Sequence, residues 1–377
     1  MKRIATEVAV LGAGLIGSAA ALALRQAGID VVLIDQDAPG AKASGVNFGG
    51  VRRQGRAIEQ LPLAQRAHDI WPRLGELIGV DGEYVRTGHL KLARSDADLA
   101  SLEAYRRRTA AYDLGLQILD GAAFRRRFPM FGPEVIGGSL CPEDGQANPR
   151  LVAPAYARAA ARAGALLVQG ERVPGIESQG ERFLLRTHAG TEVLATFVIN
   201  AAGSWGAQVA AWFGEHVPMK VKYPTMAVTE PLAPLVGVSI GVEGGGFYGR
   251  QVARGNVVMG GGFGTGLPGE RARPGPDAIA ALGRNAPRIL PGLRHAHIIR
   301  FWSGREGYFD DKNPVIGYSR RAPRLLHAFG FSGAGFQISP AVGEVLCELI
   351  QGRDALPYAA AYAVDRFPSP ATKEPAA

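Results

Sequence analysis

The chain has 377 residues, about two and a half times the roughly 150 that serve as a prior for one domain, so we expect two structural units around a large core. With 47% hydrophobic residues, 20% charged residues and 51 glycines, the composition excludes a disordered, collagen-like or small disulfide-stapled protein. The formal charge of +8 comes mainly from arginine, whose fork suits carboxylates and phosphates. This positive charge could serve to bind an anionic ligand, or it could serve only to keep the protein soluble.

The cysteines and the arginine runs narrow the class of protein further. Cys141 and Cys347 are far apart without metal-ligand spacing, which favours a reducing compartment over a disulfide framework or zinc site. The runs 106–108 and 125–127 could form a nucleic-acid patch, but they lack interleaved aromatic residues and lie in amphipathic helical patterns. We interpret them as solvated helix faces and expect no nucleic-acid partner.

The first elements form a strand, a glycine-rich turn, a helix and a second strand. The basic residues at the start and the uncharged stretch after them resemble a secretory signal peptide. The glycine spacing instead favours a strand, a turn and a helix of the folded protein. We predict a strand at Glu7–Leu11, an alanine-rich helix at Ser18–Gln26 and a strand at Asp30–Ile34 that ends on Asp35. This is the context that the G-x-G-x-x-G dinucleotide fingerprint requires.

Each residue of the fingerprint has a physical task. Gly12 permits the tight turn, Gly14 lets the backbone approach a pyrophosphate at the helix N-terminus, and Gly17 allows close helix-on-strand packing. Asp35 can accept a hydrogen bond from a ribose hydroxyl. The unit therefore predicts an adenine dinucleotide; the alternative is a glycine-rich turn in some other parallel sheet.

Three later segments are also rich in small residues or glycine, which allow a ligand to approach the backbone. The loop from Gln36 to Gly50 is long and rich in small residues, so it can wrap a larger ligand than a plain nicotinamide domain holds. Thr196–Trp205 is predicted as a buried strand that turns into a helix. His327–Gln337 is predicted as a strand, a second glycine-rich turn and the start of a helix that covers Ser339–Gln351.

Together these segments resemble the D-amino-acid oxidase family of FAD enzymes, which contains glycine oxidase, sarcosine oxidases and D-amino-acid dehydrogenases. The motifs that carry the resemblance are Val10–Gly17, Ala43–Gly45, Ile199–Gly203, Asn313–Gly317 and Gly330–Phe336. The resemblance implies an α/β protein: a Rossmann-type, glutathione-reductase-like FAD-binding domain with a second α+β substrate domain built on an antiparallel sheet. We expect a discontinuous FAD-binding domain at 1–75, 141–217 and 301–365, a substrate domain at 76–140 and 218–300, and a tail at 366–377.

Within the expected substrate domain, the clearest helical pattern covers Asp96–Leu114. Strand-like runs occur at Val221–Thr229, Phe247–Arg250 and Asn256–Gly262. The glycine-rich stretch Gly237–Gly249 is predicted as a loop.

The resemblance also implies where FAD binds. It implies that Gly12–Gly17 bind the pyrophosphate, that Asp35 binds the adenosine ribose, and that Ser44 and Gly45 add phosphate contacts. It further implies that the backbone of Val173 contacts adenine and that Gly333–Gln337 face the flavin ring. The full set of expected cofactor residues is Gly12, Ala13, Gly14, Leu15, Ile16, Gly17, Asp35, Gln36, Ser44, Gly45, Asn47, Gly49, Gly50, Val173, Ala202, Gly203, Trp205, Gly304, Gly333, Ala334, Gly335, Phe336 and Gln337.

We expect FAD to be non-covalent. The covalent cysteine of monomeric sarcosine oxidase lies near the segment of Trp302, where this chain has Ser303-Gly304-Arg305. Cys347 falls inside the last predicted helix.

The residue that anchors the substrate carboxylate departs from part of the family. Glycine oxidase and D-amino-acid oxidase place an arginine at the position that Glu306 occupies here. Arg305 is one residue away, and in an extended segment it would point to the opposite side. The monomeric sarcosine oxidases instead use an arginine just after the flavin loop, where this chain has Arg52 and Arg53. We favour these two, the alternative being surface residues or phosphate partners.

Three more residues are expected near the substrate. Glu306 could neutralise an amine or a basic side chain, or it could form a salt bridge to Arg305 or Arg300. Tyr248 and Tyr308 are equally well explained as aromatic walls of the site and as core tyrosines.

The resemblance implies an enzyme that oxidises the C–N bond of a small amino acid. The hydride would pass to flavin N5, and the resulting imino acid would hydrolyse to an oxo acid. We expect a D-amino acid or a secondary amino acid such as proline, hydroxyproline or sarcosine, with dioxygen or a respiratory-chain quinone as electron acceptor. The alternatives are an FAD-dependent 2-hydroxy-acid dehydrogenase, which would need a histidine base, and a flavin subunit of a heteromeric amino-acid or opine dehydrogenase.

The remaining expectations are absences. No catalytic nucleophile is required, and we expect no metal site, because His295 and His297 share a strand face without a third ligand. We expect a cytoplasmic protein that could contact the inner membrane or a partner subunit at its surface.

Overall fold

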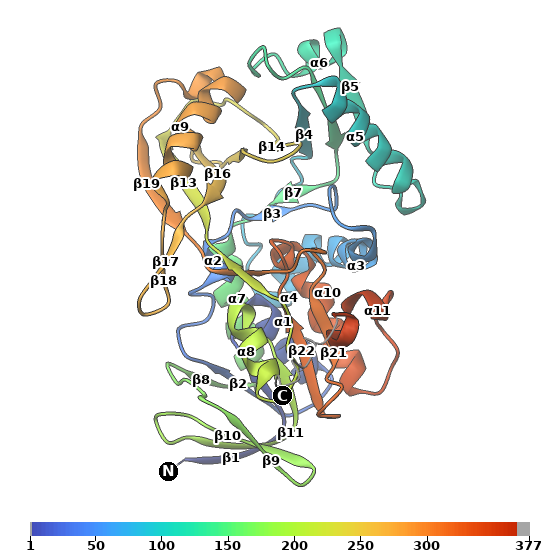
Figure 1. The fold of residues 1–377 in the computed structure, drawn as a ribbon, viewed down its shortest axis with the longest axis vertical. Helices are drawn as coiled ribbons and strands as arrows, with labels where there is room; N and C mark the ends of the chain where they lie inside the picture. The colour runs from blue at the N-terminus through green and yellow to red at the C-terminus, as the bar shows by residue number, and fades with distance from the viewer. Residues whose placement is uncertain (1, 368–377) are drawn as a thin grey trace, which may run out of the picture.

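The N-terminal strand lies at the centre of an eight-stranded sheet in one lobe of the computed structural model, which describes residues 2–367 (Figure 1). β1 (Arg3–Leu11) pairs in parallel with β2 (Val31–Asp35) and β11 (Glu192–Asn200), and the main order is β21-β22-β11-β1-β2-β8. The other strands are β8 (Leu166–Gln169), β9 (Ile176–Gln179), β10 (Arg182–Arg186), β21 (Val315–Tyr318) and β22 (Leu325–Phe329). The predicted tail lies outside the described residues apart from Arg366 and Phe367.

Helices cover one face of this sheet and bury its largest core. They are α1 (Leu15–Gln26), α3 (Leu61–Ile70), α4 (Leu74–Ile78), α7 (Pro149–Arg162) and α10 (Gly335–Ile350). α8 (Gly206–Ala211) and the ribbon of β9 and β10 pack against the opposite face. Because a parallel sheet needs cover on both faces, this layering explains why β2 is almost entirely apolar. The Rossmann-type fold is confirmed.

A second eight-stranded sheet forms the other lobe, with the order β19-β13-β16-β15-β14-β4-β6-β5. Its strands are β4 (His89–Ala93), β5 (Gln117–Asp120), β6 (Gly137–Cys141), β13 (Pro224–Pro231), β14 (Ser239–Val242), β15 (Tyr248–Gln251), β16 (Asn256–Phe263) and β19 (Ile298–Ser303). All neighbours are antiparallel except β14 and β4, which are parallel. β19 continues to Ser303, so the expected boundary at residue 301 falls inside a strand of this sheet.

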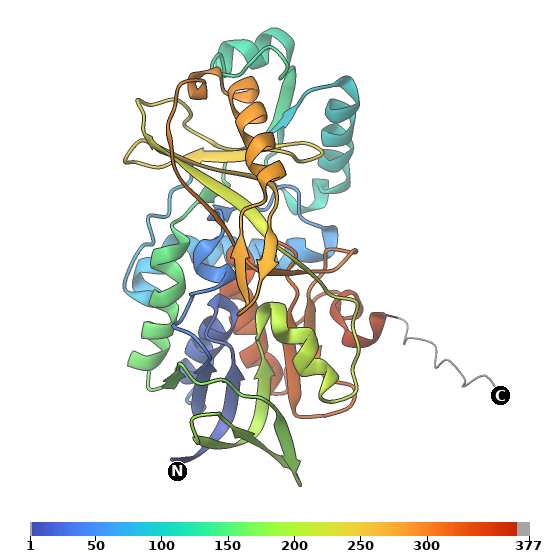
Figure 2. The same ribbon diagram turned by 60° about the vertical axis from the view of Figure 1, so that its left-hand side comes forward.

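Short elements connect the lobes. β3 (Gly50–Val51) pairs with β7 (Gly145–Gln146), and β12 (Lys220–Lys222) pairs with β20 (Glu306–Tyr308). The hairpin of β17 (Thr265–Leu267) and β18 (Arg271–Arg273) extends from the second sheet toward the first lobe (Figure 2). The remaining helices are α2 (Ala43–Val46), α5 (Asp96–Arg108), α6 (Gly121–Arg127), α9 (Pro276–Ile289) and α11 (Ala359–Tyr362).

Several predicted boundaries were wrong. α1 begins three residues before the predicted start, because its first turn contains Gly17 and glycine is typical of loops, whereas α10 begins at Gly335, inside the segment predicted to hold the helix start. α5 ends at Arg108 rather than Leu114, and the predicted loop 36–50 contains α2 and the first residue of β3. The predicted strand from Val221 is divided between β12 and β13.

The predicted loop Gly237–Gly249 was also wrong, since it contains β14 and the start of β15. A methyl group at Gly241 would lie 3.4 Å from the His89 ring, and one at Gly249 would lie 3.4 Å from the Phe247 ring. The glycines therefore leave room for rings that lie over the strands, as glycine in a strand often does.

The arginine runs differ from each other. Arg106 and Arg107 lie at the end of α5 and pair with Glu103, as solvated helix residues do. Arg125 instead donates to the carbonyls of Phe131, Gly132, Pro133 and Val135, so it organises a loop rather than a solvated face. In the described part of the chain, no helix is long and apolar enough to cross a membrane.

Candidate active site

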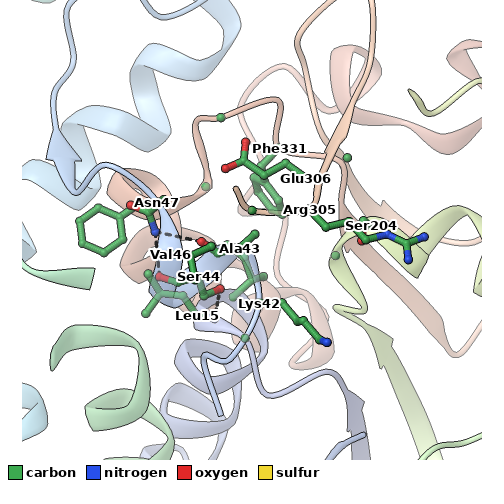
Figure 3. Close-up of a pocket in the computed structure, with 18 of the residues that line it drawn as sticks. Leu15, Lys42, Ala43, Ser44, Val46, Asn47, Ser204, Arg305, Glu306 and Phe331 are labelled. Carbon is green, nitrogen blue, oxygen red and sulfur yellow. Dashed lines mark hydrogen bonds between the residues drawn. The ribbon is translucent and has the colours of Figure 1, made fainter. Parts of the chain in front are cut away.

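A cavity of about 720 Å³ lies between the two sheets and is lined by residues from both. On the first sheet it covers the carboxyl ends of β1 and β2, where ligands bind in open α/β folds. On the second sheet it extends over β4, β14 and β15. Figure 3 shows part of the lining, in which the segment after β2 faces the segment around Glu306.

The first glycine turn is shaped for close backbone approach. Gly12 has φ +107°, and a methyl group there would lie 2.5 Å from the carbonyl oxygen of Ala201. Ser44 accepts a hydrogen bond from the backbone N–H of Leu15 at 2.8 Å (Figure 3), and a methyl group at Gly14 would lie 3.0 Å from the same hydroxyl. The start of α1 lines the cavity, and the N–H groups and positive polarisation of a helix start fit a pyrophosphate.

Asp35 is fixed beside this turn. Its carboxylate accepts hydrogen bonds from the backbone N–H of Ala13 at 2.6 Å and of Asp37 at 2.8 Å, while burial raises its pKa. Gln36 and Val173 also line this end of the cavity. The arrangement fits an adenosine ribose.

The β17–β18 hairpin contacts the same end. Glu270 at its turn accepts hydrogen bonds from Trp205 Nε1 at 2.7 Å and from Gln36 Nε2 at 3.2 Å. Arg172 lies 3.6 Å from the same carboxylate. The hairpin that follows β16 therefore holds residues that line the adenosine end of the cavity.

The second glycine turn, at the start of α10, lies beside a hydrogen-bonded polar pair on β20. Tyr308 donates a 2.8 Å hydrogen bond to Glu306 Oε2, and a methyl group at Gly333 would lie 3.5 Å from the Tyr308 hydroxyl and 4.0 Å from Glu306. Burial raises the pKa of Glu306, and the Tyr308 hydrogen bond partly offsets that rise. Burial, and then Glu306, raise the pKa of Tyr248, whose hydroxyl contacts Met226 Sδ at 3.1 Å.

Arg305 and Glu306 point apart, as expected for neighbours in an extended segment. The Arg305 guanidinium lies 4.3 Å from the centre of the Trp205 ring, and Figure 3 shows it extending toward Ser204. Its Nε is buried without a hydrogen-bond partner. No ion pair joins Glu306 to Arg305 or Arg300 among the described residues, so the predicted alternative of a salt bridge was wrong.

Arg52 and Arg53 also separate. Arg52 lines the cavity. Arg53 is only 5% exposed and is held by Asp144, which accepts from both its backbone N–H and its Nε. The guanidinium of Arg53 is therefore committed to a structural ion pair outside the cavity lining, which removes it as a carboxylate anchor.

Most of the expected residues line the cavity. They are Gly12, Gly14, Leu15, Ile16, Asp35, Gln36, Ser44, Asn47, Gly49, Gly50, Arg52, Val173, Ala202, Gly203, Trp205, Tyr248, Gly304, Arg305, Glu306, Tyr308, Gly333, Gly335 and Phe336. The lining does not include Ala13, Gly17, Gly45, Arg53, Ala334 and Gln337. Gly17 serves packing instead, because a methyl group there would lie 1.9 Å from the Gly12 carbonyl oxygen. Gln337 donates to the Ala64 carbonyl and accepts at its own carbonyl from Trp71.

Sequence reasoning left several polar residues of the lining unassigned, among them Arg56, His89 and Lys91. His89 and Lys91 lie on one face of β4, a strand that the sequence did not reveal. Burial, and then Arg52, lower the pKa of His89, which keeps its imidazole neutral. The sequence shows Arg56 close after Arg52 and Arg53, but nothing in it indicates that this side chain faces the cavity.

The comparisons with known proteins agree with this geometry. Residues 7–349 match the model of a family described as FAD dependent oxidoreductase. The chain belongs to this family. It is FAD-dependent, and the cradle of Gly12, Gly14 and Asp35 fits that cofactor.

The individual relatives reported below share only about a quarter of their residues with this chain. A subunit of the opine oxidase from Rhizobium meliloti is 27% identical over 329 residues, with 84% of this chain and 86% of that protein covered. Glycine oxidase from Geobacillus kaustophilus is 27% identical over 360 residues, with 92% and 93% covered. The crystal structure of a glycine oxidase from G. kaustophilus has a TM-score of 0.90 at 23% identity, covering 97% of this chain and 100% of that one. An L-proline dehydrogenase structure from P. horikoshii has a TM-score of 0.87 at 24% identity, with 97% and 98% covered. Family membership makes the protein an FAD-dependent oxidoreductase.

Proposed function

We propose that this enzyme oxidises the C–N bond of a small D-amino acid or secondary amino acid to an imino acid, which water hydrolyses to the oxo acid. The observation that carries the proposal is one continuous cavity that joins the dinucleotide cradle to the Glu306–Tyr308 pair and to Arg52. Bound FAD, held without a covalent bond, supplies the acceptor for two electrons and the substrate hydrogen. The lobe of the first sheet serves as the cofactor domain and the other lobe as the substrate domain.

The chain's own groups have to bind and orient the amino acid. Arg52 binds its carboxylate, as a guanidinium does in a two-point contact. Glu306, as a carboxylate, attracts the substrate ammonium and takes one proton from it, so that the amine is neutral when the C–H bond breaks. Tyr248 and Tyr308 form the walls, and their half-buried rings shield the reacting carbon from water.

One observation favours a second candidate, a 2-hydroxy-acid dehydrogenase. His89 lines the cavity, and its lowered pKa leaves a neutral imidazole that could accept a hydroxyl proton. Against this role, Gln54 lies 3.4 Å from Nδ1, and the ring lies among cations that disfavour the protonated product.

The proposal also covers the electron acceptor, the partner subunits and the location of the enzyme. Relatives include the opine oxidase subunit and a hydrogen cyanide synthase subunit, HcnC, which are by name components of larger enzymes. We propose a cytoplasmic enzyme that passes its electrons to dioxygen or a quinone, directly, at a membrane surface or through a partner subunit.

Anaerobic flavin bleaching tests the reaction. The purified yellow protein is mixed in separate wells with D- and L-amino acids, prolines, sarcosine and 2-hydroxy acids. Rapid loss of the oxidised-flavin band with an amino acid supports the proposal, and admitting air afterwards separates oxidase from dehydrogenase. Bleaching by a hydroxy acid, together with no bleaching by any amine, would contradict the proposed amine oxidation and support the 2-hydroxy-acid dehydrogenase.

A further inference from the structure

Two neighbouring arginines, the half-buried Arg52 and the buried Arg56, line the cavity without a carboxylate partner. The Arg52 guanidinium donates to the carbonyl of Gln54, and Arg56 donates through Nε to the carbonyl of Arg52 at 3.2 Å. Neither guanidinium has an ion pair within residues 2–367. The nearby acid, Asp144, is occupied by Arg53 and by the backbone N–H of Gln54.

A third cation borders the pair. A methyl group at Gly55 would lie 3.2 Å from Arg52 Nη1 and 3.6 Å from Lys91 Nζ, so both cations reach the same point of the cavity wall. Lys91 is paired with Glu243. The charge that is left uncompensated is therefore that of the two guanidiniums.

The free energy of this arrangement points to an anionic ligand with two charges. Two like charges in a buried place repel each other, and burial followed by Arg52 lowers the pKa of Arg56 to about 9. One substrate carboxylate can compensate one guanidinium. The other would remain a buried charge without a partner, which proteins rarely retain outside functional sites.

Lys91 of the cation cluster and the site tyrosine Tyr248 lie on the two strands that flank β14. Lys91, Gly241 and Tyr248 are register partners on adjacent strands β4, β14 and β15. Two strand spacings correspond to roughly 10 Å. Gly241 has no side chain between them, and the three residues line the same cavity.

We propose that the substrate is a dicarboxylic amino acid, whose first carboxylate binds Arg52 and whose second carboxylate binds Arg56. This inference rests on the proposed function for the identity of the reacting amine. The cluster thereby selects diacids over monoacids of the same backbone.

Inert ligands test the inference on the FAD-loaded enzyme without turnover. The probes are 2,2′-oxydiacetate, which carries two carboxylates and no C–N bond, and methoxyacetate, its single-carboxylate counterpart. Their Kd values are measured from the perturbation of the oxidised-flavin spectrum and by calorimetry. The wild type should bind oxydiacetate at least about tenfold more tightly, because a charged hydrogen bond is worth a factor of roughly 10 to 100.

Variants locate the second carboxylate. Arg56→Met should weaken oxydiacetate by about tenfold to a hundredfold and methoxyacetate by less than about threefold. Arg56→Lys, which keeps the charge, should fall between the wild type and Arg56→Met. Arg107→Met removes an exposed charge on α5 and should change neither Kd. FAD content and melting temperature report whether each variant is folded.

The outcomes separate the two proposals. Equal affinity of the wild type for both probes would overturn the dicarboxylate inference, whatever the variants do. Equal weakening of both probes in Arg56→Met would also overturn it, since Arg56 would then bind the first carboxylate. Diacid preference without oxidation of any amine would leave this binding inference standing and remove the proposed reaction.

Discussion

Replacing Tyr308 by phenylalanine should move the pH dependence of substrate oxidation in a predictable direction. Burial raises the pKa of Glu306, and the 2.8 Å hydrogen bond from the Tyr308 hydroxyl stabilises the carboxylate form against that rise. A hydrogen bond to a charged group contributes about 1.5–3 kcal/mol, and one pKa unit corresponds to about 1.4 kcal/mol. Tyr308→Phe should therefore raise the pKa of Glu306 further, by roughly 1–2 units.

The sign of the kinetic effect follows from the role of the carboxylate. A group with a raised pKa is protonated below that value, so Glu306 can accept the ammonium proton only at higher pH. The value of kcat/KM should increase with pH through the Glu306 pKa, and in Tyr308→Phe this increase should occur roughly 1–2 units higher. Glu306→Gln should lose the increase that depends on this carboxylate.

The assay is the anaerobic rate of flavin reduction at low substrate concentration between pH 5 and pH 10, followed by stopped-flow absorbance. Tyr248→Phe is the matched control, because its hydroxyl contacts Met226 Sδ rather than Glu306. Its profile should move by much less than that of Tyr308→Phe. An unchanged or lower pH midpoint in Tyr308→Phe, or an unaltered profile in Glu306→Gln, would refute the reasoning.

Three further predictions concern the cofactor and the fold. Gly12→Ala should remove FAD, because its methyl group would lie 2.5 Å from a carbonyl oxygen. The control Gly283→Ala, on α9, should keep the wild-type ratio of flavin to protein absorbance. Equal ratios in the two variants would contradict the tight cradle. Glu270→Gln should speed FAD release on dilution by about threefold to tenfold, since the hairpin loses its carboxylate contacts at a partly exposed site, and an unchanged rate would deny the hairpin this role. Asp144→Asn should lower the free energy of unfolding by roughly 3–5 kcal/mol in urea titrations, because Arg53 is left buried without its ion-pair partner; a loss below about 1 kcal/mol would mean that the pair is not structural.

The cofactor half of the site could be predicted because its information is local. The strand, glycine turn and helix around Gly12 follow each other directly in the chain, and the acid at Asp35 ends the next strand. Backbone sterics and the exposed N–H groups of a helix start then define a pyrophosphate site without reference to distant residues. The positions of the individual glycines in the structure agree with that reasoning.

The substrate half depends on pairings between distant strands, which local patterns do not report. His89 and Lys91 face the cavity because β4 pairs with β14, a strand hidden in a glycine-rich segment. Arg52 and Arg53 were equivalent in the sequence, but consecutive residues of an extended chain point to opposite sides. The partner that distinguishes them, Asp144, lies 91 residues further along.

The most direct test of C–N oxidation is a single anaerobic turnover with the amino acid that bleaches the flavin fastest. The bound FAD, the oxo acid and the released amine or ammonia are quantified in the same sample, and the rate is compared with that of the substrate deuterated at the reacting carbon. We predict one oxo acid and one amine per FAD reduced, with a slower rate for the deuterated substrate. Flavin reduction without an equivalent of amine product would contradict the proposed reaction.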